Sequence, residues 1–261
     1  MTLQLVRCAI EAGVAVVTLD NPPLNVVTLE LTRQLDGLVA DLASDRQVRV
    51  MLLTGEGERA FCAGSDIAEF PDLMAPGTVV PHKLEPENET YSQVNNFPKP
   101  TIAALNGLAF GGGLELALCC DLIVAEAGGQ VALPEIKLGI FPASGGTVRA
   151  TRRVGEARAK QMMFFGNPVT AETALDWGLV DNVVAPGKAL EVAMGLARVL
   201  ADGPALALQK CKQLIDMSPD APEAEVIRAS LPLSDDVFTS ADCAEGVRAF
   251  FAKETPRFER S

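Results

Sequence analysis

Two glutamates stand in apolar parts of the sequence, where a carboxylate is unusual. Glu115 follows three consecutive glycines in an otherwise apolar segment, and Glu135 directly follows Pro134. Each glutamate alone could be an ordinary carboxylate at a helix start or in a surface turn. If the strand predicted between them brings both into one pocket, desolvation and mutual repulsion would raise their proton affinity. Such a pair suits general acid–base chemistry on a weakly acidic carbon.

Two glycine-containing turns could supply hydrogen-bond donors for such a reaction. The first, FCAGSDI at residues 61–67, places a glycine just before Ser65 and a predicted helix start. The second, residues 106–113, exposes the backbone N–H groups of its glycines at a predicted helix N-terminus, where peptide dipoles favour negative charge. Both turns could stabilise a developing oxyanion, and both could equally be ordinary turns. The second turn is neither a P-loop nor a dinucleotide-binding fingerprint, because no Lys-Ser/Thr follows the glycines and their spacing differs.

The elements that must position these residues alternate between strand and helix through about the first 190 residues, which indicates an α/β layered core. Leucines at helical spacing predict a helix after Thr28, and the Pro-rich, charged residues 71–90 predict a mobile loop. Residues 107–113 predict a glycine-rich turn. After Pro186 the pattern becomes wholly helical. Strands are predicted at residues 14–19, 48–54, 101–105 and 122–125, and the late helices at 189–201, 204–217, 224–230 and 240–253.

The charge of the chain restricts its partners. The 261 residues carry a net charge of −12, which argues against nucleic acid, because phosphate binding needs a basic surface. An anionic ligand would need local Lys, Arg or backbone N–H groups. The single histidine, His82, lies in a Pro-rich stretch and is expected to be an exposed loop residue. A mechanism based on histidine therefore has little support.

The sequence also indicates where the protein resides. No apolar run reaches the roughly 18 residues that a membrane helix needs. Residues 1–10 do not have the pattern of a signal peptide. The six cysteines include no CxxC pair and are expected to be reduced thiols. We therefore expect a cytoplasmic protein without a membrane partner.

Together, these segments resemble the crotonase (enoyl-CoA hydratase/isomerase) superfamily. Residues 61–67 resemble its first oxyanion loop. Residues 106–125 (NGLAFGGGLELALCCDLIVA) resemble its second oxyanion loop and catalytic helix, and residues 134–147 (PEIKLGIFPASGGT) its second catalytic segment. Residues 167–181 and 242–258 resemble the turn–helix–strand that follows and the C-terminal helix and tail. The likeness extends nearly end to end, in order and with the family's spacing.

The resemblance implies an α/β fold of the crotonase type. This fold is a spiral of ββα repeats that continues into an all-helical C-terminal oligomerisation subdomain. We place the spiral core with the acyl-CoA site at residues 1–195 and the helical trimerisation subdomain at residues 196–261. A homotrimer, or a hexamer built as a dimer of trimers, is the implied assembly.

The resemblance also implies an enoyl-CoA hydratase, which adds water reversibly across the 2,3 double bond of an acyl-CoA thioester. The backbone N–H groups of Ser65 and Gly112 would form the oxyanion hole. Glu115 and Glu135 would hold one water, whose oxygen adds to Cβ while Glu135 passes a proton to Cα. No metal and no separate cofactor is implied, because coenzyme A is part of the substrate. The residues implied to contact CoA or substrate are Leu24, Ala63, Ser65, Asp66, Ile67, Ala68, Gly111 and Lys253.

Two positions depart from the family's pattern. Ala68 stands where many hydratases have a lysine, and Pro23 precedes Leu24 where a basic residue is common. Contacts to the CoA phosphates are therefore expected to be weaker or to come from elsewhere. Lys253 resembles the family residue that reaches CoA from a neighbouring subunit.

Three alternative functions stay open. Enoyl-CoA isomerases resemble the family at Glu135 but usually lack a carboxylate at the position of Glu115, so the presence of both favours hydration. A 3-hydroxyacyl-CoA dehydratase would use the same site in reverse. A non-catalytic or RNA-binding member of the fold is disfavoured, because the predicted first helix at residues 28–45 is acidic.

The sequence does not define the acyl group. Phe70, Met74, Met162 and Phe164 could line an acyl tunnel, although core packing is favoured for Met162 and Phe164.

Overall fold

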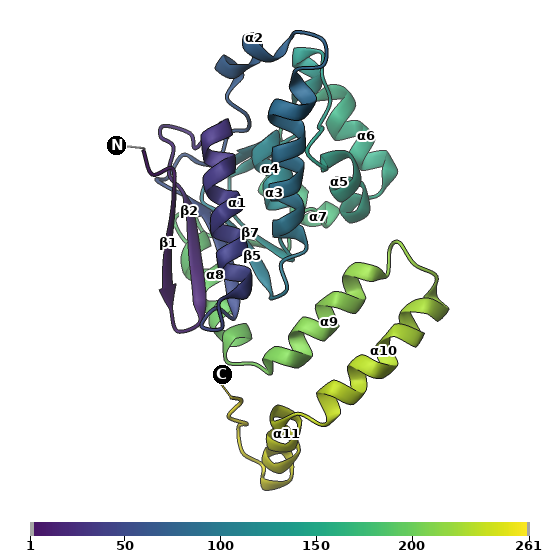
Figure 1. Cartoon of the computed structure of the whole chain (residues 1–261). Helices are drawn as coiled ribbons and strands as arrows, with labels where there is room; N and C mark the ends of the chain where they lie inside the picture. Colours follow the sequence, from purple (N-terminus) through teal and green to yellow (C-terminus); the bar gives the residue numbers. More distant parts are fainter. Residues whose placement is uncertain (1–2, 260–261) are drawn as a thin grey trace.

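Two β-sheets surrounded by helices build the fold of the computed structural model (Figure 1), which describes residues 3–259. The predicted core (residues 1–195) and helical subdomain (residues 196–261) include residues 1–2 and 260–261, which lie outside the described residues. The larger sheet has the strand order β1-β2-β3-β5-β7-β10, in which β1 is antiparallel to β2 and all other neighbours are parallel. Its strands are β1 (Val6–Glu11), β2 (Val14–Leu19), β3 (Val50–Gly55), β5 (Thr101–Leu105), β7 (Leu122–Glu126) and β10 (Asn182–Val184).

The smaller sheet has the strand order β4-β6-β8-β9. Its strands are β4 (Ala60–Cys62), β6 (Leu108–Phe110), β8 (Gln130–Ala132) and β9 (Val169–Thr170). Along the chain, one strand of each sheet is followed by helix in β3-β4-α3, β5-β6-α4 and β7-β8-α5. The predicted spiral of ββα repeats is therefore confirmed. The strands of the smaller sheet, which are only two or three residues long, were not predicted. One of them, β6 (Leu108–Phe110), lies inside the segment expected to be only a turn.

The central strands of the larger sheet, β3, β5 and β7, are buried on both faces, which explains their nearly continuous apolar sequences, whereas the edge strand β1 is largely exposed. All six residues of β3 are buried. One face packs against α8 (Ala189–Ala201), whose alanines recur at every fourth position and let the helix approach the strands closely. The opposite face belongs to the main core, which includes the buried side of α1 (Leu29–Ser44). The predicted cap of α1 is confirmed, since the hydroxyl of Thr28 accepts from the backbone N–H of Leu31 at 3.1 Å.

The mobile loop predicted at residues 71–90 is wrong. This segment contains most of α2 (Phe70–Leu73), a π-helical turn η2 (Val80–Leu84) and the first half of α3 (Glu85–Asn95). Pro71, Pro81 and Pro86 each occupy the second position of their element, where a missing N–H costs no intrahelical bond, so these prolines begin helices instead of preventing them. His82 is exposed, as expected, but lies in η2 and not in a loop.

The remaining helices of the core come after the small-sheet strands along the chain. The first of them, α4 (Gly112–Ala117), begins directly after the glycine-rich segment. A 3₁₀ turn η1 (Ile67–Glu69) precedes α2. The others are the 3₁₀ turn η3 (Glu135–Leu138), α5 (Gly146–Val154), α6 (Glu156–Phe165) and α7 (Ala171–Trp177). Among these elements, α4, η1 and η3 contribute residues to the cavity described below.

The last three helices project away from the sheets (Figure 1). They are α9 (Ala205–Met217), α10 (Glu223–Phe238) and α11 (Ala241–Ala252). The helix predicted at residues 224–230 was too short, because Pro232 lies inside α10 without ending it. Several large apolar side chains of these helices are exposed in the single chain, among them Leu231, Phe238, Phe250 and Phe251.

Among residues 3–259, no helix is long and apolar enough to cross a bilayer. Nor does any cluster of three or more His, Cys, Asp or Glu side chains within this range have an arrangement that could hold a metal ion.

Candidate active site

The backbone N–H of Ser65 is free of the sheet that surrounds it. Val27 and Ser65 form an isolated parallel bridge in which Val27 N–H donates to Gly64 O and Asp66 N–H donates to Val27 O, both at 2.8 Å. This bridge uses the groups on either side of Ser65 and leaves its own N–H directed elsewhere. Ser65 lines the main cavity of the described chain.

The second predicted oxyanion donor, Gly112, is the first residue of α4. Its N–H has no intrahelical acceptor because it lies in the first turn. Gly111, which precedes it, has φ +51°, a conformation that L side chains rarely adopt. The hydroxyl of Tyr91, on α3, donates to the carbonyl of Gly112 at 2.8 Å and so fixes the start of the helix. Gly112 lines the same cavity as Ser65.

Glu115 lies in the first turn of α4 and is only 3% exposed. Its Oε1 accepts from the backbone N–H of Ser144 at 2.9 Å and from that of Gly146 at 2.8 Å. Burial raises the pKa of Glu115 to about 8, and the negative charges of Glu135 and Glu87 add to this, whereas the two N–H donors oppose it. A carboxyl with this pKa can exchange a proton near neutral pH.

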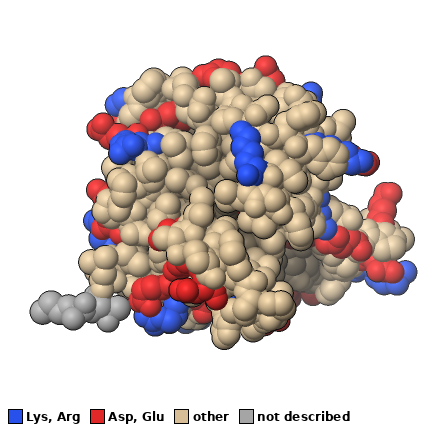
Figure 2. Space-filling view, turned by 90° about the horizontal axis from the view of Figure 1, so that it is seen from above, with Lys and Arg blue, Asp and Glu red and all other residues tan. Residues whose placement is uncertain are grey.

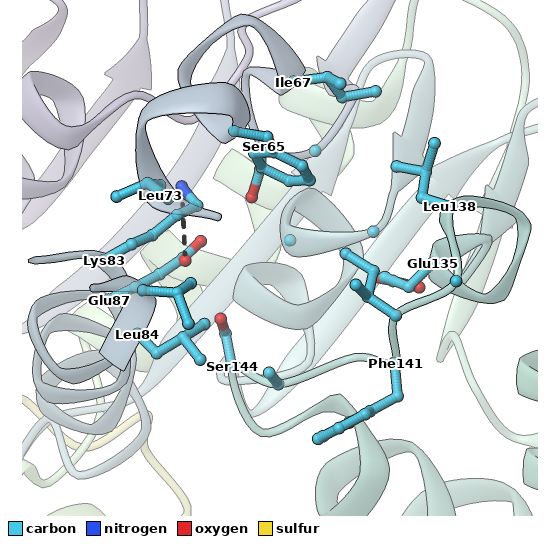
Figure 3. A pocket seen from close by; sticks show the side chains of 18 of the residues that line it. Ser65, Ile67, Leu73, Lys83, Leu84, Glu87, Glu135, Leu138, Phe141 and Ser144 are labelled. Atoms are coloured by element: carbon cyan, nitrogen blue, oxygen red, sulfur yellow. Dashed lines mark ion pairs between the residues drawn. The ribbon is translucent and has the colours of Figure 1, made fainter. Parts of the chain in front are cut away.

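Glu135 begins η3 and lies across the cavity from Glu87 (Figure 3). Neither of its side-chain oxygens has a hydrogen-bond partner within the described residues. Burial raises the pKa of Glu135 to about 7, with a further contribution from the charge of Glu87. A Cβ atom added to Gly111 would lie 3.1 Å from Glu135 Oε1, so the glycine leaves room for the carboxylate beside the oxyanion loop.

One cavity of about 750 Å³ joins these four residues. Its wall is largely apolar, with Ile67, Phe70, Leu73, Met74, Leu138, Ile140 and Phe141 among its lining residues. Such a volume and an apolar wall with a few convergent polar groups are typical of a small-molecule site. Phe70 and Met74 line this cavity, as a role in an acyl tunnel requires, whereas Met162 is a core residue, as favoured. The core packing expected for Phe164 is wrong, since this side chain is 66% exposed.

The predicted substrate contacts divide into two groups. Ala63, Ser65, Ile67 and Gly111 line the cavity. Leu24, Asp66 and Ala68 do not line it but shape its loop. The carbonyl of Leu24 accepts from Ala63 N–H at 2.9 Å, and Asp66 Oδ1 accepts from Ala68 N–H at 3.0 Å.

Lys253 lies outside the cavity of its own chain, at the end of α11 in the projecting helical part (Figure 1). The face above α2 carries its Lys and Arg side chains singly among other residues, without a large basic patch (Figure 2). Lys137 and Lys83 are the basic residues on the cavity wall. Among the residues that the structure describes, this face therefore has no basic patch that could take over the phosphate contacts expected to be weakened by Ala68.

The sequence reasoning missed Lys83 and Glu87, two charged residues in the cavity wall. Their side chains are 5% and 2% exposed, and Lys83 Nζ lies 3.7 Å from Glu87 Oε2. The Pro-rich, charged composition of residues 71–90 predicts an exposed loop, and charged side chains in such a loop are expected to be solvated. The four-residue spacing of Lys83 and Glu87 was the one available sign of an ion pair along a helix, but the same spacing is equally common on solvated helix faces.

Asn88 connects α3 to the loop that holds Glu115. Its Nδ2 donates to the carbonyl of Leu84 at 2.8 Å and to that of Ala143 at 2.9 Å. Ala143 directly precedes Ser144, whose N–H donates to Glu115. The position of this loop therefore depends on the helix that also carries Glu87.

Comparison with known proteins identifies the family. The model of the enoyl-CoA hydratase/isomerase family matches residues 9–261. The chain belongs to this family. A probable enoyl-CoA hydratase of Rhizobium meliloti is 36% identical over 260 residues, covering 99% of each chain. The 2,3-dehydroadipyl-CoA hydratase of Escherichia coli K12 is 36% identical over 251 residues, covering 94% of this chain and 95% of the relative.

Solved structures support the same family assignment. An enoyl-CoA hydratase from Bacillus anthracis superimposes with a TM-score of 0.93 at 31% identity, covering 99% of this chain and 100% of that one. DspI from Pseudomonas aeruginosa gives a TM-score of 0.94 at 32% identity, covering 98% and 97%. The crotonase-type α/β fold expected from the sequence is thereby confirmed, and so is the family resemblance.

Proposed function

We propose that this member of the enoyl-CoA hydratase/isomerase family is an enoyl-CoA hydratase. The observation that carries the proposal is the presence of Glu115 and Glu135 in one cavity with the two backbone donors Ser65 and Gly112. The raised pKa values, about 8 for Glu115 and about 7 for Glu135, suit a pair that shares one proton near neutral pH. By these pKa values that proton lies mainly on Glu115, so it must pass to Glu135 before Glu135 can give it to Cα. The names of relatives that are 36% identical support the same general reaction.

The proposed mechanism uses each group for one task. The thioester oxygen accepts from the N–H groups of Ser65 and Gly112, which stabilise the enolate-like state. Glu115 takes a proton from water as its oxygen bonds to Cβ, and Glu135 gives its proton to Cα. The reverse sequence removes water from a 3-hydroxyacyl-CoA. The two N–H donors on Glu115 stabilise its charged form, whereas the unpartnered oxygens of Glu135 remain available to a substrate.

The principal alternative is an enoyl-CoA isomerase. Moving a double bond needs one carboxylate to carry a proton between two carbons, and Glu135 alone could do this. A second buried carboxylate, held by two N–H donors, has no task in that reaction. Glu115 therefore favours hydration.

The assembly and the location belong to the same proposal. Exposed Phe250 and Phe251 on α11 are apolar surface that subunit contacts in a trimer or a hexamer could cover. In such an assembly Lys253 would reach CoA in a neighbouring subunit. We expect this enzyme to act in the cytoplasm.

A spectrophotometric assay tests the function. Hydration of crotonyl-CoA removes the conjugated double bond, and the absorbance loss gives the rate. We expect turnover with one or more 2-enoyl-CoAs of differing length and branching. Failure with all of them, together with clear conversion of a 3-enoyl-CoA to the 2-enoyl form, would assign the isomerase.

A further inference from the structure

Lys83, Glu87 and Glu69 form a charged cluster at one side of the active-site cavity. Lys83 and Glu87 are buried and line the cavity wall, whereas Glu69 lies outside that wall and is partly exposed. Lys83 comes from η2, Glu87 from the first turn of α3 and Glu69 from η1. Lys83 Nζ lies 3.7 Å from Glu87 Oε2 and 3.9 Å from Glu69 Oε2. These separations are ion pairs without hydrogen bonds. Figure 3 shows Lys83 and Glu87 on the cavity wall, across from Phe141 and Leu138.

The cluster has unused hydrogen-bonding capacity. Lys83 Nζ and Glu87 Oε1 are fully buried atoms without a hydrogen-bond partner among residues 3–259. The hydroxyl of nearby Tyr91 donates to the carbonyl of Gly112, and the hydroxyl of Ser144, on the same cavity wall, helps to lower the pKa of Glu87. Leaving a buried donor and a buried acceptor unpaired is costly, whereas a ligand that pairs with both recovers that free energy. The cluster therefore has the properties of a binding site and not only of a structural ion pair.

The cluster lies beside the reacting groups. A Cβ atom added to Gly112 would be 3.3 Å from Glu87 Oε1 and 3.4 Å from Ser65 Oγ. The charge of Glu87 also raises the pKa of both Glu115 and Glu135. A group that contacts Glu87 would thus belong to the acyl part of the substrate, within a few carbons of the double bond.

The chemistry of the cluster selects the group. Lys83 can only donate a hydrogen bond. Burial raises the pKa of Glu87, and the ammonium of Lys83 opposes this; as the carboxylate partner of Lys83, Glu87 can only accept. A hydroxyl does both, so it pairs with both residues at once. A carboxylate would pair with Lys83 but would face the charges of Glu87 and Glu69. An alkyl chain would satisfy neither residue.

We propose that Lys83 and Glu87 recognise a hydroxyl group on the acyl chain, beyond the reacting carbons. This inference rests on the proposed function, since it names the substrate class of the same cavity. The preferred substrates are 2-enoyl-CoAs that carry a hydroxyl group on the acyl chain. The apolar wall around Phe70, Leu73 and Phe141 accommodates the carbon atoms of that chain.

Binding measurements test this inference separately from the reaction. In the Glu135→Gln background, calorimetry gives Kd for hex-2-enoyl-CoA, its 4-hydroxy and 6-hydroxy derivatives, and hex-2-enedioyl-CoA. We expect one hydroxylated ligand to bind at least about tenfold tighter than the other three ligands. Adding Lys83→Met and Glu87→Gln should reduce that preference to less than about twofold. The exposed pair Glu156 and Lys160 has the same spacing, so adding Glu156→Gln and Lys160→Met instead is the matched control and should keep the preference.

The outcomes separate the two proposals. Equal affinity for hydroxylated and plain ligands overturns the recognition site, and so does tighter binding of the dicarboxylic ligand. Both of these results are obtained in the Glu135→Gln protein alone, so they can be read even if the Lys83→Met/Glu87→Gln variant does not fold. A hydroxyl preference that persists in the Lys83→Met/Glu87→Gln variant also overturns it. Failure of the wild-type protein to hydrate any 2-enoyl-CoA would reject the proposed function alone, because binding does not require turnover.

Discussion

Gly146 lies directly against the carboxylate of Glu115. Its N–H donates to Glu115 Oε1 at 2.8 Å, and a Cβ atom added to this glycine would stand 2.8 Å from the same oxygen. Because Gly146 has no side chain, the first residue of α5 can lie close enough to Glu115 to donate a hydrogen bond to its carboxylate. The same Cβ would also meet Pro142 at 3.0 Å, so it could not move aside easily.

Gly146→Ala should therefore displace Glu115 and lower kcat for crotonyl-CoA at least about tenfold, because misplacing a catalytic group by about 1 Å is costly. Gly37→Ala in α1 is the matched control, since a Cβ there meets nothing within 4 Å. That variant should retain kcat. Unchanged kcat in Gly146→Ala would show that contact with this glycine does not position Glu115 for the reaction.

Glu135→Gln should abolish hydration while the fold remains intact. The amide keeps the shape of the side chain but cannot give a proton to Cα. We expect kcat for crotonyl-CoA to fall about 100- to 10,000-fold, as for loss of a general acid. Circular dichroism and thermal unfolding check the fold. Glu58→Gln, an exposed position, is the control, and full activity in Glu135→Gln would refute the assignment.

Glu115→Gln should separate hydration from isomerisation. Hydration needs a base for water and should fall at least about 100-fold. Transfer of a double bond from the 3 to the 2 position needs only Glu135 and should fall less than about tenfold. Measuring both reactions on one preparation gives the ratio. An equal loss of both activities would contradict the separate roles.

The pH dependence of kcat/KM for crotonyl-CoA should be bell-shaped, with its maximum between pH 7 and 8. The reaction needs one protonated and one ionised carboxyl, and the pKa values of Glu135 and Glu115 are raised to about 7 and about 8. Below this range both carboxyls are protonated, and above it both are ionised. Because the two groups interact, the limbs belong to the pair and not to single residues. A rate that is constant from pH 5.5 to 9.5 would exclude the pair as the acid and base.

The stability of the protein should also depend on Glu115. The folded protein holds its proton more tightly than the unfolded chain, since folding raises its pKa from 4.5 to about 8. This contribution is complete below pH 4.5 and is lost as pH rises through about 8. Glu115→Gln should therefore raise Tm at pH 8.5 by about 3 °C or more relative to the wild type, with a smaller difference at pH 5.5. Thermal unfolding at both pH values measures this, and a Tm difference independent of pH would oppose it.

The sequence predicts the reaction centre better than the substrate pocket. Glu115 and Glu135 follow distinctive segments, and the short distance along the chain between them keeps both beside the small sheet. Lys83 and Glu87 could not be found in this way. Their burial depends on α3 packing against α1, where Gln93 donates to Asp36 at 2.6 Å, and on the distant loop that Asn88 contacts. These are long-range contacts that local composition does not contain.

The same limit applies to the C-terminal part. Periodicity predicted α8 and α9 correctly, because their apolar spacing is local. It did not reveal that the alanines of α8 lie on the large sheet. It also ended α10 too early, because a proline usually weakens a helix interior and here does not end it.

The two hydrogen bonds of Asn88 give α3 a second role. The helix that carries Glu87 also contacts, through Asn88, the loop at Ala143. The next residue of that loop, Ser144, donates its N–H to Glu115. A poorly fitting acyl group that shifts α3 would consequently disturb the base as well as weaken binding. Substrate discrimination in this protein should then be visible in the turnover number itself, with poor substrates remaining slow even at saturating concentration.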